Sequence, residues 1–155
     1  MNEPQQQSVF GIEKIYVKDL SLEIPHAPDV FLSAEQPQVE VQLHNEGSPI
    51  SEGMYQVVLT ITVTAKAGEK TLFLVEVAQA GIFQIRNVPE SDIDPLLATA
   101  CPTILFPYAR ESVSDIINRA GFPPVYLAPV NFDAIYMQRL QQIQEQAAPK
   151  IEIAH

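Results

Sequence analysis

The chain has 155 residues, a usual size for one domain, and its formal net charge is -10 at pH 7. So acidic a protein repels nucleic acid and anionic membrane surfaces, which argues against both classes of partner. Its one cysteine, Cys101, cannot form a disulfide within the chain, and its neighbours are apolar. We therefore expect Cys101 to pack as a buried side chain rather than to act as a nucleophile.

Residues 1–8 are polar and rich in glutamine, with too few apolar side chains to order themselves. We expect a disordered tail there, followed by a single domain over 9–143. The tail lacks the basic and apolar regions of a signal peptide, and nowhere do 18 apolar residues run together. These features predict a cytoplasmic protein.

Residues 9–24 have the composition of a strand whose apolar positions change phase twice. The successive sets are Phe10 and Ile12, then Ile15 and Val17, then Leu20, Leu22 and Ile24. Phase changes of this kind predict a bulge or a kink at each change. Because side chains alternate along a strand, Asp19 and Glu23 should be neighbours on the solvent face.

A turn is predicted at 25–29, and Phe31 follows it as an apolar side chain on a loop. Phe31 either covers the core or belongs to a surface groove. Val39, Val41 and Leu43 then alternate with polar residues, which predicts a second strand with one wet face. Residues 45–53 are expected to form a loop.

The clearest hairpin joins strands at 55–65 and 71–78 through a connection at 66–70. Glu76 must remain solvated, so the face that it shares with Leu74 should be the outer one. An outward leucine beside a carboxylate is a candidate contact patch.

Two helices are predicted next, a short one at 91–100 and a longer one from Pro102 through 120, which Gly121 ends. The longer helix has a continuous apolar stripe at three- and four-residue steps. Its members are Leu105, Tyr108, Ala109, Val113, Ile116, Ile117 and Ala120.

A proline-rich crossover leads to a last helix with Asn131 as its N-cap. The apolar side of this helix comprises Phe132, Ile135, Tyr136, Leu140 and Ile143. After it, residues 144–155 are expected to be a flexible tail.

The sequence gives no support to an enzyme or a metal site. Gly68-Glu69-Lys70-Thr71 lacks the glycines of a phosphate-binding loop, and Ser112 does not lie in a nucleophile elbow. The three histidines are far apart and lack metal-ligand spacing. We expect neither catalytic residues nor a cofactor.

Five segments resemble one family in the same order and spacing over about 9–143. They are KIYVKDLSLEIPHAPDVF at 14–31, VVLTITVTAKAGEKTLFLVEVAQAGIF at 57–83, LFPYARE at 105–111, GFPP at 121–124 and LAPVNFDAIY at 127–136. Together they are similar to the bacterial protein-export chaperone family SecB.

The resemblance implies an α+β fold with a four-stranded antiparallel sheet and helices packed on one face, which assembles as a dimer of dimers. The homotetramer would bind unfolded secretory preproteins in surface grooves without nucleotide, and deliver them to the translocation ATPase SecA. The implied groove residues are Phe31, Val41, Leu43, Tyr126, Leu127, Phe132 and Tyr136.

The family's motor-binding surface corresponds to Asp19, Glu23, Leu74 and Glu76, where a basic, zinc-binding tail of SecA would meet complementary charge. The helix stripe would lie between subunits, through Leu105, Tyr108, Val113, Ile116 and Ile117. From the residues alone an alternative stays open, a binding protein for a small apolar ligand. That alternative predicts saturable uptake of ligand by a closed monomer or dimer.

Overall fold

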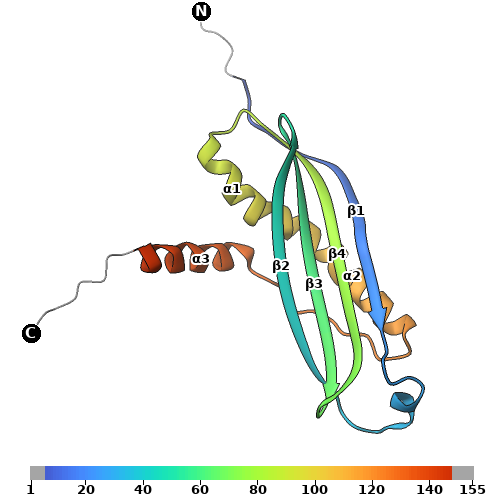
Figure 1. The fold of residues 1–155 in the computed structure, drawn as a ribbon. Coiled ribbons are helices and arrows are strands. Elements are labelled where there is room, and N and C mark those ends of the chain that lie inside the picture. The colour runs from blue at the N-terminus through green and yellow to red at the C-terminus, as the bar shows by residue number, and fades with distance from the viewer. Residues whose placement is uncertain (1–5, 148–155) are drawn as a thin grey trace, which may run out of the picture.

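The computed structural model describes residues 6–147. Four strands are followed by three helices, with one short 3-10 helix after the first strand (Figure 1). The elements are β1 (Val9–Glu23), η1 (Asp29–Leu32), β2 (Gln38–Ser51), β3 (Met54–Ala67), β4 (Lys70–Arg86), α1 (Glu90–Ala98), α2 (Ala100–Arg119) and α3 (Phe132–Ala147).

The strands form one antiparallel sheet in the order β1-β4-β3-β2, so β1 and β2 are its two edges. Helix α2 packs across one face of the sheet against β3 and β4. Helix α1 packs on α2 and β2, whereas α3 contacts the other helices and extends beyond the β2 edge (Figure 1). The predicted α+β fold with helices on one face is confirmed.

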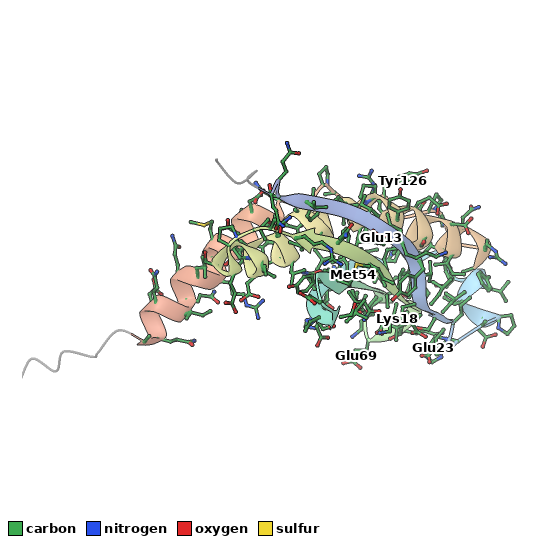
Figure 2. The ribbon with its side chains drawn as sticks, turned by 90° about the horizontal axis from the view of Figure 1, so that it is seen from above. Glu13, Lys18, Glu23, Met54, Glu69 and Tyr126 are labelled. Atoms are coloured by element: carbon green, nitrogen blue, oxygen red, sulfur yellow. The ribbon has the colours of Figure 1, made fainter. Side chains whose placement is uncertain are left out.

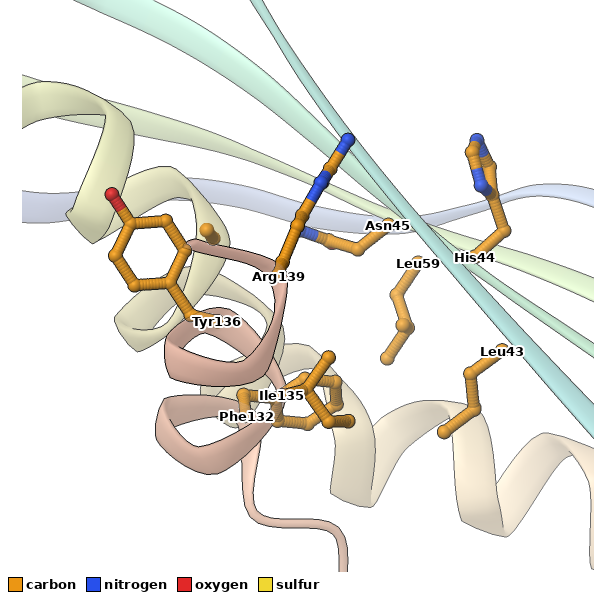
Figure 3. A pocket seen from close by; sticks show the side chains of 9 residues that line it. Leu43, His44, Asn45, Leu59, Phe132, Ile135, Tyr136 and Arg139 are labelled. Atoms are coloured by element: carbon orange, nitrogen blue, oxygen red, sulfur yellow. The ribbon is translucent and has the colours of Figure 1, made fainter. Parts of the chain in front are cut away.

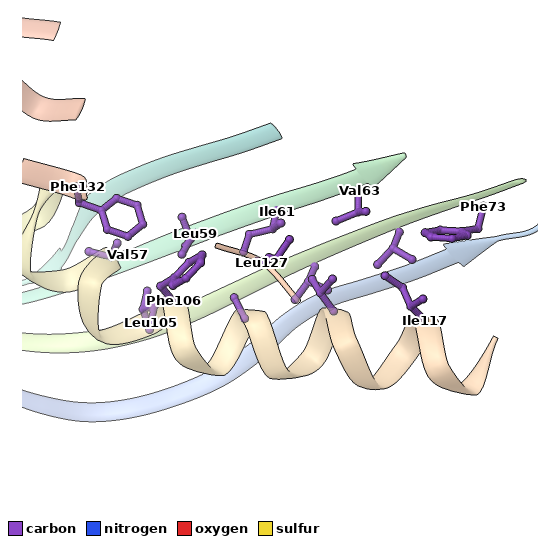
Figure 4. Packing of buried hydrophobic residues seen from close by; sticks show 14 of the residues in the cluster. Val57, Leu59, Ile61, Val63, Phe73, Leu105, Phe106, Ile117, Leu127 and Phe132 are labelled. Atoms are coloured by element: carbon purple, nitrogen blue, oxygen red, sulfur yellow. The ribbon is translucent and has the colours of Figure 1, made fainter. Parts of the chain in front are cut away.

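The core lies between α2 and the helix-facing side of β3 and β4 (Figure 4). β3 contributes Val57, Leu59, Ile61 and Val63, all fully buried, because every second side chain of a strand faces the same way. Helix α2 contributes Leu105, Val113 and Ile117, at steps that return to one side of a helix. Cys101 is also fully buried, as predicted.

Gly81 allows this close packing of helix on sheet. A Cβ at this position would lie 2.7 Å from the ring of Phe83 and 3.0 Å from Cδ2 of Leu105. Glycine in the middle of β4 therefore leaves the space into which α2 inserts its leucine.

Strand β1 has the two predicted bulges. Its pairing with β4 shifts between Ile12 and Lys14 and again between Val17 and Asp19. Each shift inserts one extra residue, which moves all later side chains to the opposite face. The bulges thus keep apolar side chains facing the helices along the whole strand, although their sequence parity changes.

Two predicted connections were too long. The loop expected at 45–53 is wrong, since β2 continues to Ser51 and only Glu52 and Gly53 turn the chain. Residues 45–49 and Ser51 pair with β3, with a register shift between Pro49 and Ser51, so strand pairing extends β2 although the segment lacks apolar alternation. Likewise Gly68 and Glu69 alone connect β3 to β4, and Gly68 has a φ of 63°.

The ends of the helices largely follow the predicted signals. Gly121 follows α2 with a φ of 93°, and Asn131 caps α3 by accepting a 3.0 Å hydrogen bond from the backbone N–H of Ala134. Helix α3 continues to Ala147, which lies inside the tail predicted from residue 144. The rest of that predicted tail, 148–155, and residues 1–5 of the predicted N-terminal tail lie outside the described residues.

Candidate binding surfaces

Asp19, Glu23, Leu74 and Glu76 lie together on the sheet face that carries no helix. The register pairs Glu23 with Leu74, Ser21 with Glu76 and Asp19 with Ala78, and residues paired across antiparallel strands point to the same side. The three carboxylates are exposed and Leu74 is half-buried. The structure therefore brings these four predicted residues together, and we name this surface the acidic face.

Two more carboxylates belong to the acidic face, although the sequence reasoning did not single them out. Glu40 pairs with Thr64 and Glu46 with Val58, which places both side chains on the same side as Glu76. Their signal was present in the sequence, because Glu40 alternates with Val39 and Val41. Thr62 also lies here, and its hydroxyl donates a 3.5 Å hydrogen bond to Oε2 of Glu76.

The acidic face and the helices lie on opposite sides of the sheet. Figure 2 shows Tyr126 on the helix-bearing side and Glu23 towards the other side. The carboxylates of the acidic face lie on the bare side of the sheet, whereas the pockets described next open beside the helices.

A groove opens between β2, the end of α1 and α3. Its first part is a pocket of about 220 Å³, and a second part of about 350 Å³ continues it along α3. The two parts share Asn45, Ala98, Tyr136 and Arg139. Leu43 and Phe132, both predicted groove residues, line the first part together with Tyr136 (Figure 3). We name this concavity the α3 groove.

The floor of the α3 groove is apolar and held in place by the core. Leu59 is fully buried at its base, and Phe132 is buried with its ring 6.0 Å from that of Phe106 in an edge-to-face contact. The side-chain amide of Asn45 donates a 3.0 Å hydrogen bond to the carbonyl of Leu97, which ties β2 to the end of α1. The groove is thus walled by elements that are fixed to one another.

Asn45, Ile135 and Arg139 are among the residues that line the α3 groove and that the sequence does not single out as site residues. Asn45 was placed in a predicted loop, although it lies on β2. Ile135, 48% exposed, was assigned only to the apolar side of its helix, and Arg139 is a single cation on a helix and carries no sequence signal.

The remaining predicted groove residues do not line the α3 groove. Val41 is 43% exposed and continues the apolar row of Leu43 along β2. Phe31 packs on Phe122 with ring centroids 5.1 Å apart, and Phe122 in turn contacts Phe73. Phe31 is therefore part of a separate aromatic cluster.

Tyr126 and Leu127 line a third concavity, of about 720 Å³, between the crossover and the polar side of α2. Tyr126 is exposed, whereas Leu127 is buried and packs in the core. The seven predicted residues thus fall into three neighbourhoods rather than one continuous groove.

The predicted interface stripe of α2 is divided between the core and the surface of its own chain. Leu105, Val113 and Ile117 are fully buried against the sheet of their own chain, so they leave no surface for a second copy. Tyr108 is 51% exposed and Ile116 is partly exposed, and only these two of the five predicted interface residues remain available. The physical reason is that a small sheet needs this helix to complete its own core.

The exposed apolar surface lies instead where β1 borders α2. Tyr108 shares a concavity of about 450 Å³ with Ile15, Val17 and Pro107. Several other side chains of β1 are also exposed, namely Val9, Phe10, Ile12 and Leu20. A row of apolar residues on an edge strand is a candidate contact surface between chains.

The described part of the chain contains no cluster of metal-binding side chains and no activated nucleophile. Among residues 6–147, no three His, Cys, Asp or Glu side chains gather as they would around a metal ion. Burial raises the pKa of the Cys101 thiol from 9.0 to about 12, so the thiol stays protonated and a poor nucleophile. None of the helices within 6–147 has the length and apolar character needed to cross a membrane.

Comparison with known proteins decides the family. The model of the family described as preprotein translocase subunit SecB matches residues 3–143. The chain belongs to the SecB family. It is 63% identical over 151 residues to the protein-export protein SecB of Dechloromonas aromatica, covering 97% of each chain. It is also 63% identical to that of Methylobacillus flagellatus, over 89% of this chain and 88% of the relative.

A solved structure agrees with the fold. A SecB-like chaperone of Mycobacterium tuberculosis, in complex with a peptide from an antitoxin, superposes with a TM-score of 0.66 at 17% identity. The match covers 79% of this chain and 91% of that one. Membership of the SecB family makes this chain a protein-export chaperone and not an enzyme. It decides against the alternative of a small-ligand carrier.

Proposed function

We propose that this SecB chain acts in the cytoplasm, holds unfolded secretory preproteins without nucleotide, and delivers them to the SecA motor. The observation that carries the client part of the proposal is the α3 groove, with its apolar floor beside the exposed apolar row of β2. Holding a client requires only binding free energy, so no cofactor enters the scheme.

The α3 groove would take aromatic or aliphatic side chains of an extended segment. Leu43 and Ile135 offer half-exposed apolar surface on opposite walls, and Leu59 closes the base. Tyr136 and Arg139 place polar groups at the same pocket. Contacts of this kind select by hydrophobicity rather than by sequence, as a chaperone for many clients needs.

The acidic face would bind the motor. Asp19, Glu23 and Glu76 present a negative surface with Leu74 at one end beside Glu23, which suits a basic partner segment with some apolar surface. Groove and acidic face lie on opposite sides of the sheet, so one chain would bind client and motor at the same time.

The assembly would be a homotetramer, a dimer of dimers. Tyr108 and Ile116 on α2, with the exposed apolar residues of β1, are the surfaces that support contact between copies. Several α3 grooves in one assembly would then act on one long client and raise its apparent affinity through effective concentration.

Refolding of a slow-folding secretory precursor tests the holdase activity. The denatured precursor is diluted into buffer with and without this protein, in the absence of nucleotide. We expect refolding to stall near one tetramer per client and to resume when a competing unfolded chain is added. Unchanged refolding over a wide range of chaperone concentration would refute the proposal.

A pair of substitutions on α3 tests the groove. Ile135→Asp places a charge in the α3 groove, whereas Met137→Asp places one on the same helix outside the residues that line it. The two side chains are 48% and 56% exposed, so both variants should fold. We expect client affinity to fall about tenfold or more for Ile135→Asp only. Equal affinities of the two variants would contradict the groove assignment.

A charge-reversal pair tests the acidic face. Glu76→Lys changes the acidic face, and Glu145→Lys makes the same change in net charge on α3. We expect weaker binding to SecA at low salt for Glu76→Lys alone, with the tetramer intact by light scattering. Motor affinity that does not distinguish the two variants would contradict this surface.

A further inference from the structure

The acidic face depends on a backbone irregularity in β1. Val17 pairs with Gln79 and Asp19 pairs with Ala78, so Lys18 is an extra residue without a partner on β4. In a regular strand Asp19 would share the face of Val17, which looks towards the helices. The bulge at Lys18 is therefore what turns Asp19 and Glu23 to the side of Glu76.

Gln79 lies beneath this bulge. It is 3% exposed and, within residues 6–147, the one buried residue with a polar side chain. It lies on the helix-facing side of β4, opposite Val17 on one neighbouring strand and Leu59 on the other. Its Nε2 donates a 3.1 Å hydrogen bond to the backbone carbonyl of Tyr16, whereas its buried Oε1 accepts no hydrogen bond from any residue of 6–147.

A glutamine is an unfavourable choice for packing at this position. Gln79 lies between Val17 and Leu59 and lines the concavity beside Tyr108, and burial of its Oε1 carries a desolvation cost that a leucine or methionine of similar volume would lack. What the amide alone supplies is a donor to the main chain of β1 beside the residue that breaks the ladder. A bulge disrupts the ladder locally, so such a bond selects one register over its alternatives.

We propose that Gln79 is a positioning residue for the acidic face: its amide fixes the β1 bulge and so keeps Asp19 and Glu23 beside Glu76. Gln79 itself would make no contact with SecA, because its side chain lies on the side of the sheet opposite the acidic face. The effect of Gln79 on SecA binding rests on the proposed function, whereas the effect of Gln79 on the β1 bulge does not.

Hydrogen exchange of the backbone tests the effect on the bulge. Gln79→Met removes the donor at nearly constant volume. Gln84→Met makes the same change farther along β4, opposite Gly11. We expect exchange of the amides at 16–20 to accelerate about tenfold in Gln79→Met, as for loss of one hydrogen bond, with β3 unchanged. Unchanged exchange at 16–20, or the same acceleration in Gln84→Met, would overturn the proposal.

Binding to SecA tests the consequence through a double-mutant cycle. Asp19→Asn removes one carboxylate of the acidic face, and Gln79→Met is combined with it. If Gln79 acts through the placement of Asp19, Gln79→Met weakens binding about threefold or more alone and less in the Asp19→Asn background. A merely structural loss would give the same fold-change in both backgrounds and would overturn this part.

The two arms separate failure of the inference from failure of the proposed function. Wild-type protein that does not bind SecA refutes the motor contact, and the exchange measurement still decides whether Gln79 fixes the bulge. Wild-type binding that Gln79→Met leaves unchanged refutes the positioning role alone.

Discussion

Cys101 illustrates how burial sets the chemistry of one residue. Its side chain is fully buried at the start of α2, where no solvent stabilises a thiolate. Burial therefore raises the pKa of the thiol to about 12. Cys101 therefore contributes to stability by packing in the core. Its contribution to the free energy of unfolding depends on pH only in the alkaline range.

The alkaline range gives a prediction. The pKa is higher in the folded than in the unfolded chain, so the stabilisation is complete below pH 9.0 and is lost as pH rises towards about 12. Relative to Cys101→Ala, the wild type should lose about 1.4 kcal/mol of unfolding free energy per pH unit above pH 9. Urea unfolding of both proteins from pH 8 to 11 measures this difference. Parallel pH curves would contradict it.

At the scale of elements, the approach of α2 to the sheet is set by a missing side chain. Gly81 leaves room for Leu105 and the ring of Phe83, and the buried stripe of α2 then packs along β3 and β4. The same packing buries Leu105, Val113 and Ile117, so that only Tyr108 and Ile116 of the five predicted interface residues remain exposed for contacts outside the chain.

Two glycines in neighbouring strands allow a matched test. Gly81→Ala adds a methyl that meets Phe83 at 2.7 Å, whereas a Cβ at Gly11 meets nothing within 4 Å. We expect Gly81→Ala to reduce the unfolding free energy by about 1–3 kcal/mol through overpacking. Gly11→Ala should be close to neutral, as measured by chemical denaturation. An equal effect of both substitutions would mean that the loss of glycine, and not the close approach of α2, determines the cost.

At the scale of the whole molecule, the two faces of the sheet carry different surfaces. One face carries the helices and the α3 groove, and the other carries the carboxylates of the acidic face. The two edges also differ. β2 borders the groove, whereas β1 exposes apolar side chains beside Tyr108. The proposed contacts with client, motor and further copies of the chain therefore use different parts of the surface.

Assembly through the β1 side predicts the effect of a charge at that surface. Val17→Asp changes a side chain that is 46% exposed beside Tyr108, and Leu32→Asp changes one that is 87% exposed on η1. We expect Val17→Asp to lower the molar mass measured by light scattering at micromolar concentration, because a buried unpaired charge opposes association. Leu32→Asp should leave the mass unchanged. A Val17→Asp protein of unchanged mass would remove β1 from the interface.

Much of the acidic face could be predicted from local sequence, whereas the groove could not. Asp19, Glu23, Leu74 and Glu76 each belong to a strand whose alternation fixes its face, and antiparallel neighbours then collect them. The α3 groove joins β2, α1 and α3, which come together only through packing. Phe31 and Tyr126, which the family resemblance implies as groove residues, lie outside the α3 groove.

The sequence by itself determined the element types, the β1 bulges, the end of α2 at Gly121 and the cap at Asn131, because each depends on side-chain period or on local backbone chemistry. Only the tertiary structure decided which side of α2 is buried against the sheet, how far β2 extends beyond Asn45, and which carbonyl accepts the hydrogen bond from the amide of Gln79. The physical reason is that burial and strand pairing depend on residues distant in the chain. A local pattern indicates which side chains can be buried, and the packed fold determines which residues cover them.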